Sequence, residues 1–315
     1  MNNYADLIET SPKLIANANM HGLCNRLKFA ASAKALADFC GREFVLQWEG
    51  FSNFWENELT IVSDYDKRCN IIKKPTWRVV DGIDQHRRTR TIKKLNTYAH
   101  SGFRHLYAAG GYGFVPEGMS IVAYNNAKSE FYKSLIPTAA VKAALNSVPF
   151  TVDEQTLGLQ VRVSKKSYAG IKGEDYRPSW EFDLDKWVAA IEESLGSFSS
   201  VFVTTNDLSI VSDIESALGR DITVNFFDRE DTERAGGSIW GSVNSELTSL
   251  ILDLAEWYML SNCGKIVYSY GSSFGYEACF INKLSHSIEQ SPNNEAYNCN
   301  DQWGANHYPL IFEYQ

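Results

Sequence analysis

HGLCNRLKFAASAKALADFCGREFVLQW, residues 21–48, joins a glycine-containing loop, an alanine-rich segment and a short apolar run. Small and apolar side chains recur every three or four positions over residues 27–39, which predicts a helix. Gly41 follows as a stop signal, and the apolar residues 44–46 predict a short buried strand. With residues 13–18 as the preceding strand, the order strand, loop, helix, strand is typical of the start of an open α/β sheet.

The same alternation returns in the second half of the chain. Apolar runs typical of buried strands occupy residues 157–163, 200–204, 222–227 and 265–269. Helical patterns lie at residues 183–195, 207–218 and 245–261. Strands that alternate with helices indicate a second parallel, doubly wound sheet. We therefore expect an α/β protein of two Rossmann-like lobes, residues 1–150 and 151–315, with a cleft between them.

The middle of the first half is less regular. Residues 50–110 lack a clean period, so we expect loops, short strands and irregular helices there. Residues 84–94 (DQHRRTRTIKK) are basic, and residues 110–114 (GGYGF) predict a turn or loop. Residues 128–145 predict helix around a break at Pro137. The boundary between the two lobes is expected after this helical segment.

The composition is that of a globular protein with sizeable cores. The chain has 315 residues, of which 44% are hydrophobic and 13% aromatic, and this length suits two lobes. Its 30 Lys and Arg stand against 38 Asp and Glu, which gives a net charge of −8. An acidic chain has no overall attraction to nucleic acid or to an anionic membrane surface, so neither is expected as a partner.

The sequence gives no indication of a membrane segment, a leader or structural zinc. Its N-terminus lacks a basic segment followed by an apolar stretch. The most apolar run, Leu247–Leu260, contains Asp253 and Glu256, so it predicts a buried helix rather than a transmembrane one. The six cysteines include no CxxC pair, which suits a reducing compartment. We therefore expect a cytoplasmic protein.

One charged residue stands out in the second half. In parallel sheets, ligands bind outside the carboxyl ends of the strands. Arg162 interrupts the apolar strand pattern of residues 157–163, where an unpaired charge would be costly to bury. Its planar guanidinium suits the oxygens of a phosphate, and a structural ion pair with a carboxylate is the alternative.

Two later features have the same polar character. The segment YGSSFG, residues 270–275, links a strand to a helix, so Ser272, Ser273 and nearby amides form either an anion seat or an ordinary capped turn. Asp253 lies on the apolar face of an expected buried helix, where a carboxylate needs a hydrogen-bond donor. The N–H groups of a base, notably guanine, would supply one; solvent or an internal arginine are the alternatives.

Four segments together resemble the fucosyltransferase superfamily, which includes the α1,6-fucosyltransferases, the nodulation fucosyltransferases and the protein O-fucosyltransferases. Residues 22–46 are similar to its G-x-G-N-R opening, and LGLQVRV (157–163) resembles its H-x-R strand. VFVTTNDLSIV (201–211) resembles its hydrophobic-A-T-D-D segment, and residues 249–274 resemble its long helix, strand and Ser-Ser loop. The matches follow the family's order, whereas residues 50–150 match poorly.

The resemblance implies a GT-B fold and transfer of fucose from GDP-fucose, with inversion at the anomeric carbon and no metal or cofactor. It implies that Arg162 binds the donor's pyrophosphate and is needed for activity, and that Asp253 contacts guanine. The other donor-binding positions that it implies are Asn25, Arg26, Gln160, Ser272, Ser273 and Phe274. Of these, Asn25 and Arg26 would lie in an N-terminal loop. The acceptor would be a hydroxyl of a glycan or glycolipid.

Three positions depart from the family's pattern. Gln160 replaces a histidine, Val163 replaces a second arginine or histidine of many members, and Asn206 replaces the first aspartate of A-T-D-D. These changes keep open another GDP-linked or nucleotide-linked sugar, or a non-catalytic protein that binds carbohydrate or nucleotide. Glu49 and Asp175 are the candidates for the general base.

Two alternatives use other residues. A metal-dependent GT-A transferase would need a D-x-D motif to hold Mn²⁺ or Mg²⁺ on the diphosphate. Asp64-Tyr65-Asp66 follows an apolar run, whereas Asp183-Leu184-Asp185 predicts the start of a helix. Neither motif accounts for Arg162 or the Ser-Ser loop. Nucleic-acid binding through residues 86–94 is the other alternative, and a solvated basic loop explains that segment better.

Overall fold

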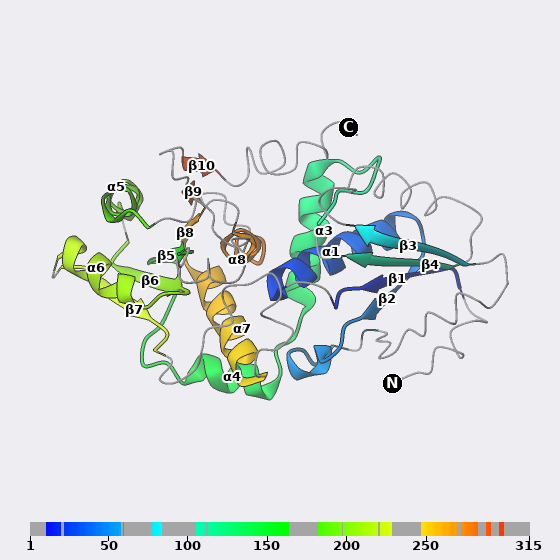
Figure 1. Ribbon diagram of the computed structural model, residues 1–315, viewed down its shortest axis with the longest axis horizontal. Helices are drawn as coiled ribbons and strands as arrows, with labels where there is room; N and C mark the ends of the chain where they lie inside the picture. Colours follow the sequence, from blue (N-terminus) through cyan, green and yellow to red (C-terminus); the bar gives the residue numbers. More distant parts are fainter. Residues whose placement is uncertain are drawn as a thin grey trace, which may run out of the picture. The chain divides into compact units, whose positions relative to one another are not determined.

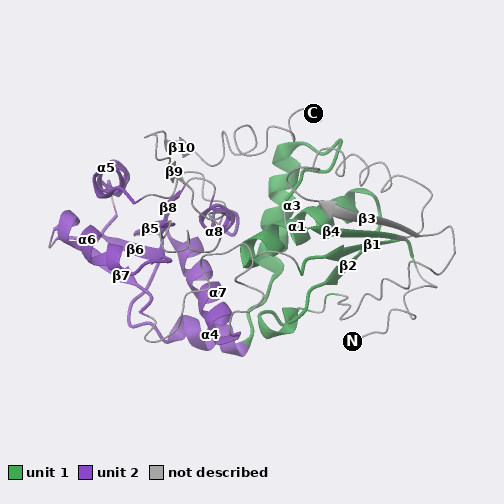
Figure 2. Cartoon of the chain, viewed as in Figure 1, with its two compact units in different colours: residues 1–138, 308–315 green, residues 139–307 purple. Residues whose placement is uncertain are grey.

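The computed structural model describes residues 11–19, 22–57, 59, 77–83, 105–110, 113–163, 182–196, 198–219, 221–228, 247–269, 272–282, 288–290 and 296–298. The chain divides into two compact units, one that runs to Thr138 and one that begins at Ala139 (Figure 2). This division precedes the expected boundary at residues 150 and 151, because helix α4 (Ala139–Asn146) packs on helix α7 (Leu247–Asn262) of the second unit.

The first unit is built on a four-stranded parallel sheet in the order β2-β1-β4-β3 (Figure 1). Its strands are β1 (Lys13–Asn17), β2 (Glu43–Gln47), β3 (Trp77–Ile83) and β4 (His105–Gly110). Leu14, Ile15 and Ala16 are completely buried because β1 has a neighbouring strand on both sides. The predicted strands at residues 13–18 and 44–46 are therefore confirmed. Strands β3 and β4 lie within residues 50–110, where short strands were expected without defined positions.

Helix α1 (Leu23–Phe39) packs on β1, β2 and helix α3 (Ile121–Ser134). Its alanines, among them Ala30 and Ala33, are buried, and their small side chains let the helix approach the sheet closely. The predicted helix is confirmed, but it begins at Leu23, four residues before the periodic pattern does.

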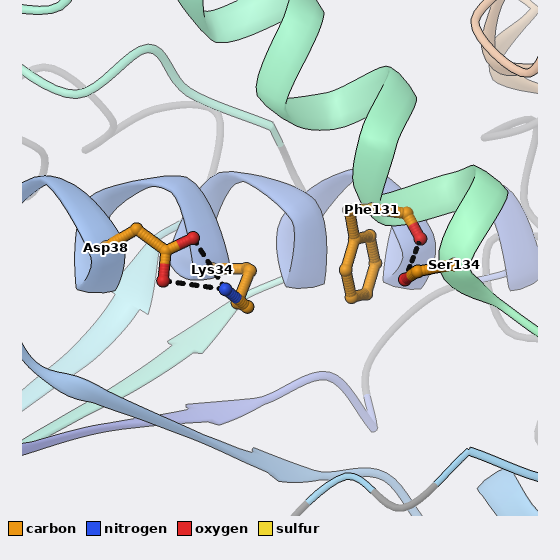
Figure 3. Close-up of polar contacts among 4 residues, drawn as sticks. All are labelled: Lys34, Asp38, Phe131 and Ser134. Atoms are coloured by element: carbon orange, nitrogen blue, oxygen red, sulfur yellow. Dashed lines mark hydrogen bonds and ion pairs between the residues drawn. The ribbon is translucent and has the colours of Figure 1, made fainter.

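Helices α1 and α3 each carry a local polar contact between residues close in sequence (Figure 3). On α1, Lys34 Nζ lies 2.6 Å from Asp38 Oδ1, an exposed pair four residues apart that contributes a few tenths of a kcal/mol at most, roughly. At the end of α3, Ser134 Oγ donates to the carbonyl oxygen of Phe131 at 2.7 Å. Helix α3 ends before Pro137, which confirms the predicted break.

The second unit is built on a six-stranded sheet in the order β10-β9-β8-β5-β6-β7. Its strands are β5 (Thr156–Val161), β6 (Ser200–Thr205), β7 (Thr223–Phe226), β8 (Lys265–Ser269), β9 (Ile288–Gln290) and β10 (Ala296–Asn298). All neighbours pair in parallel except β9 and β10. The four predicted strands are confirmed as β5 to β8, and β9 and β10 extend the sheet at one edge.

Helices cover both faces of this sheet. The shorter helices are α5 (Leu184–Leu195), α6 (Ser209–Leu218) and α8 (Ser273–Ala278). Leu157, Leu159 and Val161 of β5 share a core with α5 and α6. Residues of a strand alternate between faces, so the intervening residues face α7 and α8. Among the described helices, none has the length and apolar composition that crossing a bilayer requires.

Candidate functional site

The strand order of the second unit reverses between β5 and β8. The chain builds β5, β6 and β7 outward in one direction and then returns to place β8 on the other side of β5. Open parallel sheets bind ligands at such a reversal, outside the carboxyl ends of the two strands. The residues that follow β5 and β8 are therefore the candidate site.

Arg162 is the first residue after β5. The strand ends at Val161, so the expectation that Arg162 lies inside the strand is wrong by one residue. Its backbone N–H donates to Ser269 Oγ, the last residue of β8, at 2.7 Å. Val163 still packs on the core under α5 and α6, so the alternation of β5 continues past its end. Arg162 therefore belongs, with Gln160, to the opposite face of the sheet.

Ser272 and Ser273 follow β8 at the same edge. The backbone N–H of Ser272 donates to the carbonyl oxygen of Ser269 at 3.0 Å, so Ser269 is bonded to the residues on both sides of the reversal. Ser272 is buried at the start of α8, and its side chain makes no capping hydrogen bond. Ser273 and Phe274, half-buried, form the first turn of α8. The predicted helix is confirmed, and Ser272 lies near the end of β5 because it and Arg162 both bond to Ser269.

Gln160 lies between these two parts. It is buried with 4% of its surface exposed, and its Oε1 has no hydrogen-bond partner among the described residues. A Cβ added to Gly275 of α8 would lie 3.2 Å from that oxygen, which places Gln160 directly against α8. A buried polar atom of this kind is expected to have a hydrogen-bond partner, so Oε1 can accept a hydrogen bond from a ligand.

Asn206 follows β6, on the other side of Arg162. Its Oδ1 accepts from the N–H of Val163 at 2.7 Å, and its Nδ2 donates to the carbonyl oxygen of Val163 at 2.8 Å. Leu208 is the N-cap of α6 and makes no side-chain capping hydrogen bond. Asp207 Oδ1 accepts from the N–H of Ser209 at 3.2 Å, whereas the Asn206 side chain binds Val163. Sequence analysis missed this contact because it joins residues far apart in the chain.

Asp253 lies in the middle of α7, the helix that packs on β5, β6 and α8. It is half-buried, whereas the next residue, Leu254, is completely buried. The predicted buried helix is confirmed, but Asp253 lies at its margin rather than at the centre of its apolar face.

Asn25 and Arg26 belong to the first unit, and they lie in the first turn of α1 rather than in a loop. The N-cap of α1 is Gly22, which has no side chain to cap the helix, so the usual sequence signal of a helix start is missing. The Arg26 guanidinium stacks over the Trp48 ring, with Cζ 5.7 Å from the ring centroid. Burial lowers the pKa of Arg26, and the charge of nearby Glu49 opposes that shift.

The first sheet also reverses its strand order, between β1 and β4, and polar side chains meet there. Asn17 Nδ2 donates to Tyr107 Oη at 2.5 Å, and Tyr107 Oη donates to Gln47 Oε1 at 3.1 Å. Asn19 continues the network, because Asn17 Oδ1 accepts from its N–H and Asn19 Oδ1 accepts from the N–H of Glu49 at 2.6 Å. This network fixes the backbone that carries exposed Glu49, and sequence analysis identified none of its other members.

Of the two D-x-D motifs, only Asp183-Leu184-Asp185 lies in the described part of the chain. Asp183 begins α5, where its side chain accepts from the N–H of Lys186 at 3.3 Å and pairs with the Lys186 ammonium at 3.0 Å. Asp64 and Asp66 lie outside the described residues, as does Asp175. In the described part of the chain, no group of three or more His, Cys, Asp or Glu residues is placed to hold a metal ion.

Solved structures of fucosyltransferases superpose on the chain along most of its length. The NodZ α-1,6-fucosyltransferase soaked with GDP-fucose matches with a TM-score of 0.61 at 14% identity, over 92% of this chain and 99% of that chain. Fucosyltransferase NodZ from Bradyrhizobium gives 0.60 at 14% identity, over 91% and 98%. A mutant of Arabidopsis thaliana FUT1 in complex with GDP gives 0.60 at 15% identity, over 90% and 71%.

POFUT1 in complex with GDP-fucose is more distant, with a TM-score of 0.52 at 10% identity, over 90% of this chain and 98% of that chain. No protein-family model matches the chain. No curated protein matches it either. Identities this low establish the fold alone: the chain is an α/β protein with two sheets, and its fold is that of the GT-B fucosyltransferase structures.

Proposed function

We propose that the chain is an inverting, metal-independent glycosyltransferase that transfers a sugar from a GDP-linked donor, with fucose as the first candidate. The acceptor would be a hydroxyl group of a glycan or glycolipid. The observation that carries this proposal is the meeting of Arg162 with the Ser272 turn at the reversal between β5 and β8, through Ser269.

The chemistry of these groups suits a diphosphate. A guanidinium offers a planar fork of N–H donors that matches phosphate oxygens. The hydroxyls of Ser272 and Ser273 lie at the same strand ends, and neither caps α8. Gln160 contributes a buried oxygen that accepts from a ligand N–H or O–H, and Asp253 is the partner that we propose for guanine.

The proposed reaction breaks the bond between the anomeric carbon and the diphosphate, and forms one from that carbon to the acceptor oxygen. Negative charge grows on the leaving GDP, and a cation held in place stabilises it more in the transition state than in the bound donor. Arg162 would supply that cation. The acceptor proton passes to a base, for which exposed Glu49 is the candidate among the described residues.

A panel of nucleotides tests the donor class. A ligand that binds the native state raises its melting temperature, so GDP should raise Tm more than UDP, CMP or ADP at equal concentration. Release of GDP from GDP-fucose, with and without glycan acceptors, then separates transfer from hydrolysis and from binding alone.

Two variants of one residue test the role of the cation. Arg162→Ala should lower the transfer rate by about 100-fold or more while Tm stays near that of the wild type. Arg162→Lys keeps the charge but lacks the planar fork, so it should recover only part of that loss. A full rate in Arg162→Ala, or a larger Tm shift with UDP than with GDP, would contradict the proposal.

A further inference from the structure

Asn206 holds the backbone next to Arg162 through both ends of one amide group. Beyond Val161, the strand β5 has no further backbone partners on β6 in the sheet register, which ends at the pair Val161 and Thr205. The Asn206 side chain takes over there, since it binds the N–H of Val163 at 2.7 Å and its carbonyl oxygen at 2.8 Å. The ladder is thus continued by a side chain.

The second of these contacts needs an amide. An ionised aspartate has two oxygens that accept hydrogen bonds and no donor. At this position it could accept from the N–H of Val163, but its other oxygen would face the carbonyl oxygen of Val163, and the two would repel. The departure from the A-T-D-D pattern therefore has a physical reason in this chain, because only the amide satisfies both backbone groups.

Arg162 is held from the other side as well. Its N–H is bonded to Ser269 on β8, and the Val163 side chain packs on the core under α5 and α6. Contacts from β6, β8 and the core therefore fix the backbone around one residue. We propose that Asn206 is a positioning residue, which fixes the Val163 peptide so that the Arg162 guanidinium is presented to the diphosphate of a nucleotide; this inference rests on the proposed function.

If Asn206 has a positioning role, its loss should weaken binding of the diphosphate and leave binding of the guanine base unchanged. We would measure dissociation constants for GDP and for guanosine by calorimetry with wild type, Asn206→Asp, Asn206→Ala and Arg162→Ala. Each Asn206 variant should bind GDP about tenfold more weakly, because a hydrogen bond that places the cation is lost, while guanosine affinity stays within a factor of two, roughly.

A double variant separates positioning from other effects. If Asn206 acts through Arg162, then Arg162→Ala with Asn206→Asp binds GDP no more weakly than Arg162→Ala alone. A direct repulsion between the new aspartate and the phosphates would instead lower affinity further in the double variant. Asn206→Ala carries no charge, so a loss in this variant excludes repulsion as the cause.

Asp183→Ala is the control for stability. It removes the cap of α5 in the same unit, at a cost in stability comparable to that of the Asn206 variants, and it should leave both affinities unchanged. Three results would overturn the inference: a loss of GDP affinity in the Asn206 variants that adds to the loss in Arg162→Ala, an equal loss of guanosine affinity, or no loss of GDP affinity at all. If wild type itself bound GDP no better than guanosine, the proposed function would fail first, and the two failures are distinguishable.

Discussion

Gly275 allows α8 to lie against β8, and adding one methyl group there should disturb both the fold and the site. A Cβ at this position would lie 2.3 Å from Tyr268 Cβ and 2.7 Å from Tyr268 Cγ, well inside the 3.4 Å at which ordinary contact begins. Tyr268 is completely buried and its backbone belongs to the sheet, so it has little room to yield. To relieve the clash, α8 must move outward by about 1.1 Å, the difference between 2.3 Å and the ordinary contact distance of 3.4 Å.

Overpacking of this kind costs about 1–3 kcal/mol, and the near-backbone contact favours the upper end. For a unit of this size, each kcal/mol lowers Tm by about 2–4 °C, so Gly275→Ala should melt roughly 6–12 °C below wild type. The same movement displaces Ser272 and Ser273, so GDP should raise the Tm of the variant less than that of wild type.

Differential scanning fluorimetry with and without GDP would measure both effects. Gly22→Ala is the control for a methyl group added without a clash, because its φ is −72° and no atom lies within 4 Å of the added group. Gly22 is the N-cap of α1 and alanine is a poorer cap, so this control should itself cost about 1 kcal/mol. An unchanged Tm together with an unchanged GDP shift in Gly275→Ala would refute the close approach of α8 to β8, and with it the geometry of the site.

Two further outcomes follow from single groups in the second unit. Asp253→Asn should weaken GDP binding by about tenfold or more and leave UDP binding unchanged, because a charged acceptor for guanine N–H groups is lost. Titration with both nucleotides measures this effect. If the variant kept the wild-type preference for GDP over UDP, the assignment of Asp253 would be contradicted. Burial raises the pKa of the Cys263 thiol, so in alkaline solution the unfolded chain ionises at the ordinary value of 9.0 while the folded chain does not. Stability should therefore fall as pH rises above about 9, and chemical denaturation of Cys263→Ala at pH 8 and 10 should show a weaker fall than wild type.

Much of the fold follows from local patterns. Strands β5, β6 and β8 are continuous apolar runs because they have a neighbour on both sides, and α5 carries its apolar residues on one face. The positions of β3 and β4 could not be predicted, because Asp81 and Gly82 interrupt the apolar run of β3, and two alanines and a glycine end β4. Composition alone does not distinguish such short, interrupted strands from loops.

The candidate site was also predictable only in part. Arg162 could be identified because a charge in an apolar strand is costly and therefore informative. The contacts around it could not be predicted, because Ser269 binds the N–H of Arg162 from one neighbouring strand and Asn206 binds the adjacent Val163 from the other side. No local sequence pattern gives the strand order that brings these residues together. Likewise, Asn17, Gln47 and Tyr107 are unremarkable in sequence, and only the parallel pairing of three strands brings their ends together.

The two-ended contact of Asn206 also makes the chain sensitive to a slow chemical change. Deamidation, the ordinary ageing reaction of asparagine, releases ammonia through a cyclic imide that reopens to aspartate or isoaspartate, and either product lacks the N–H donor that binds the Val163 carbonyl oxygen. A neutral amide would be exchanged for a negatively charged carboxylate, with hardly any change in mass. An old preparation would thus be expected to look native and yet hold its nucleotide poorly.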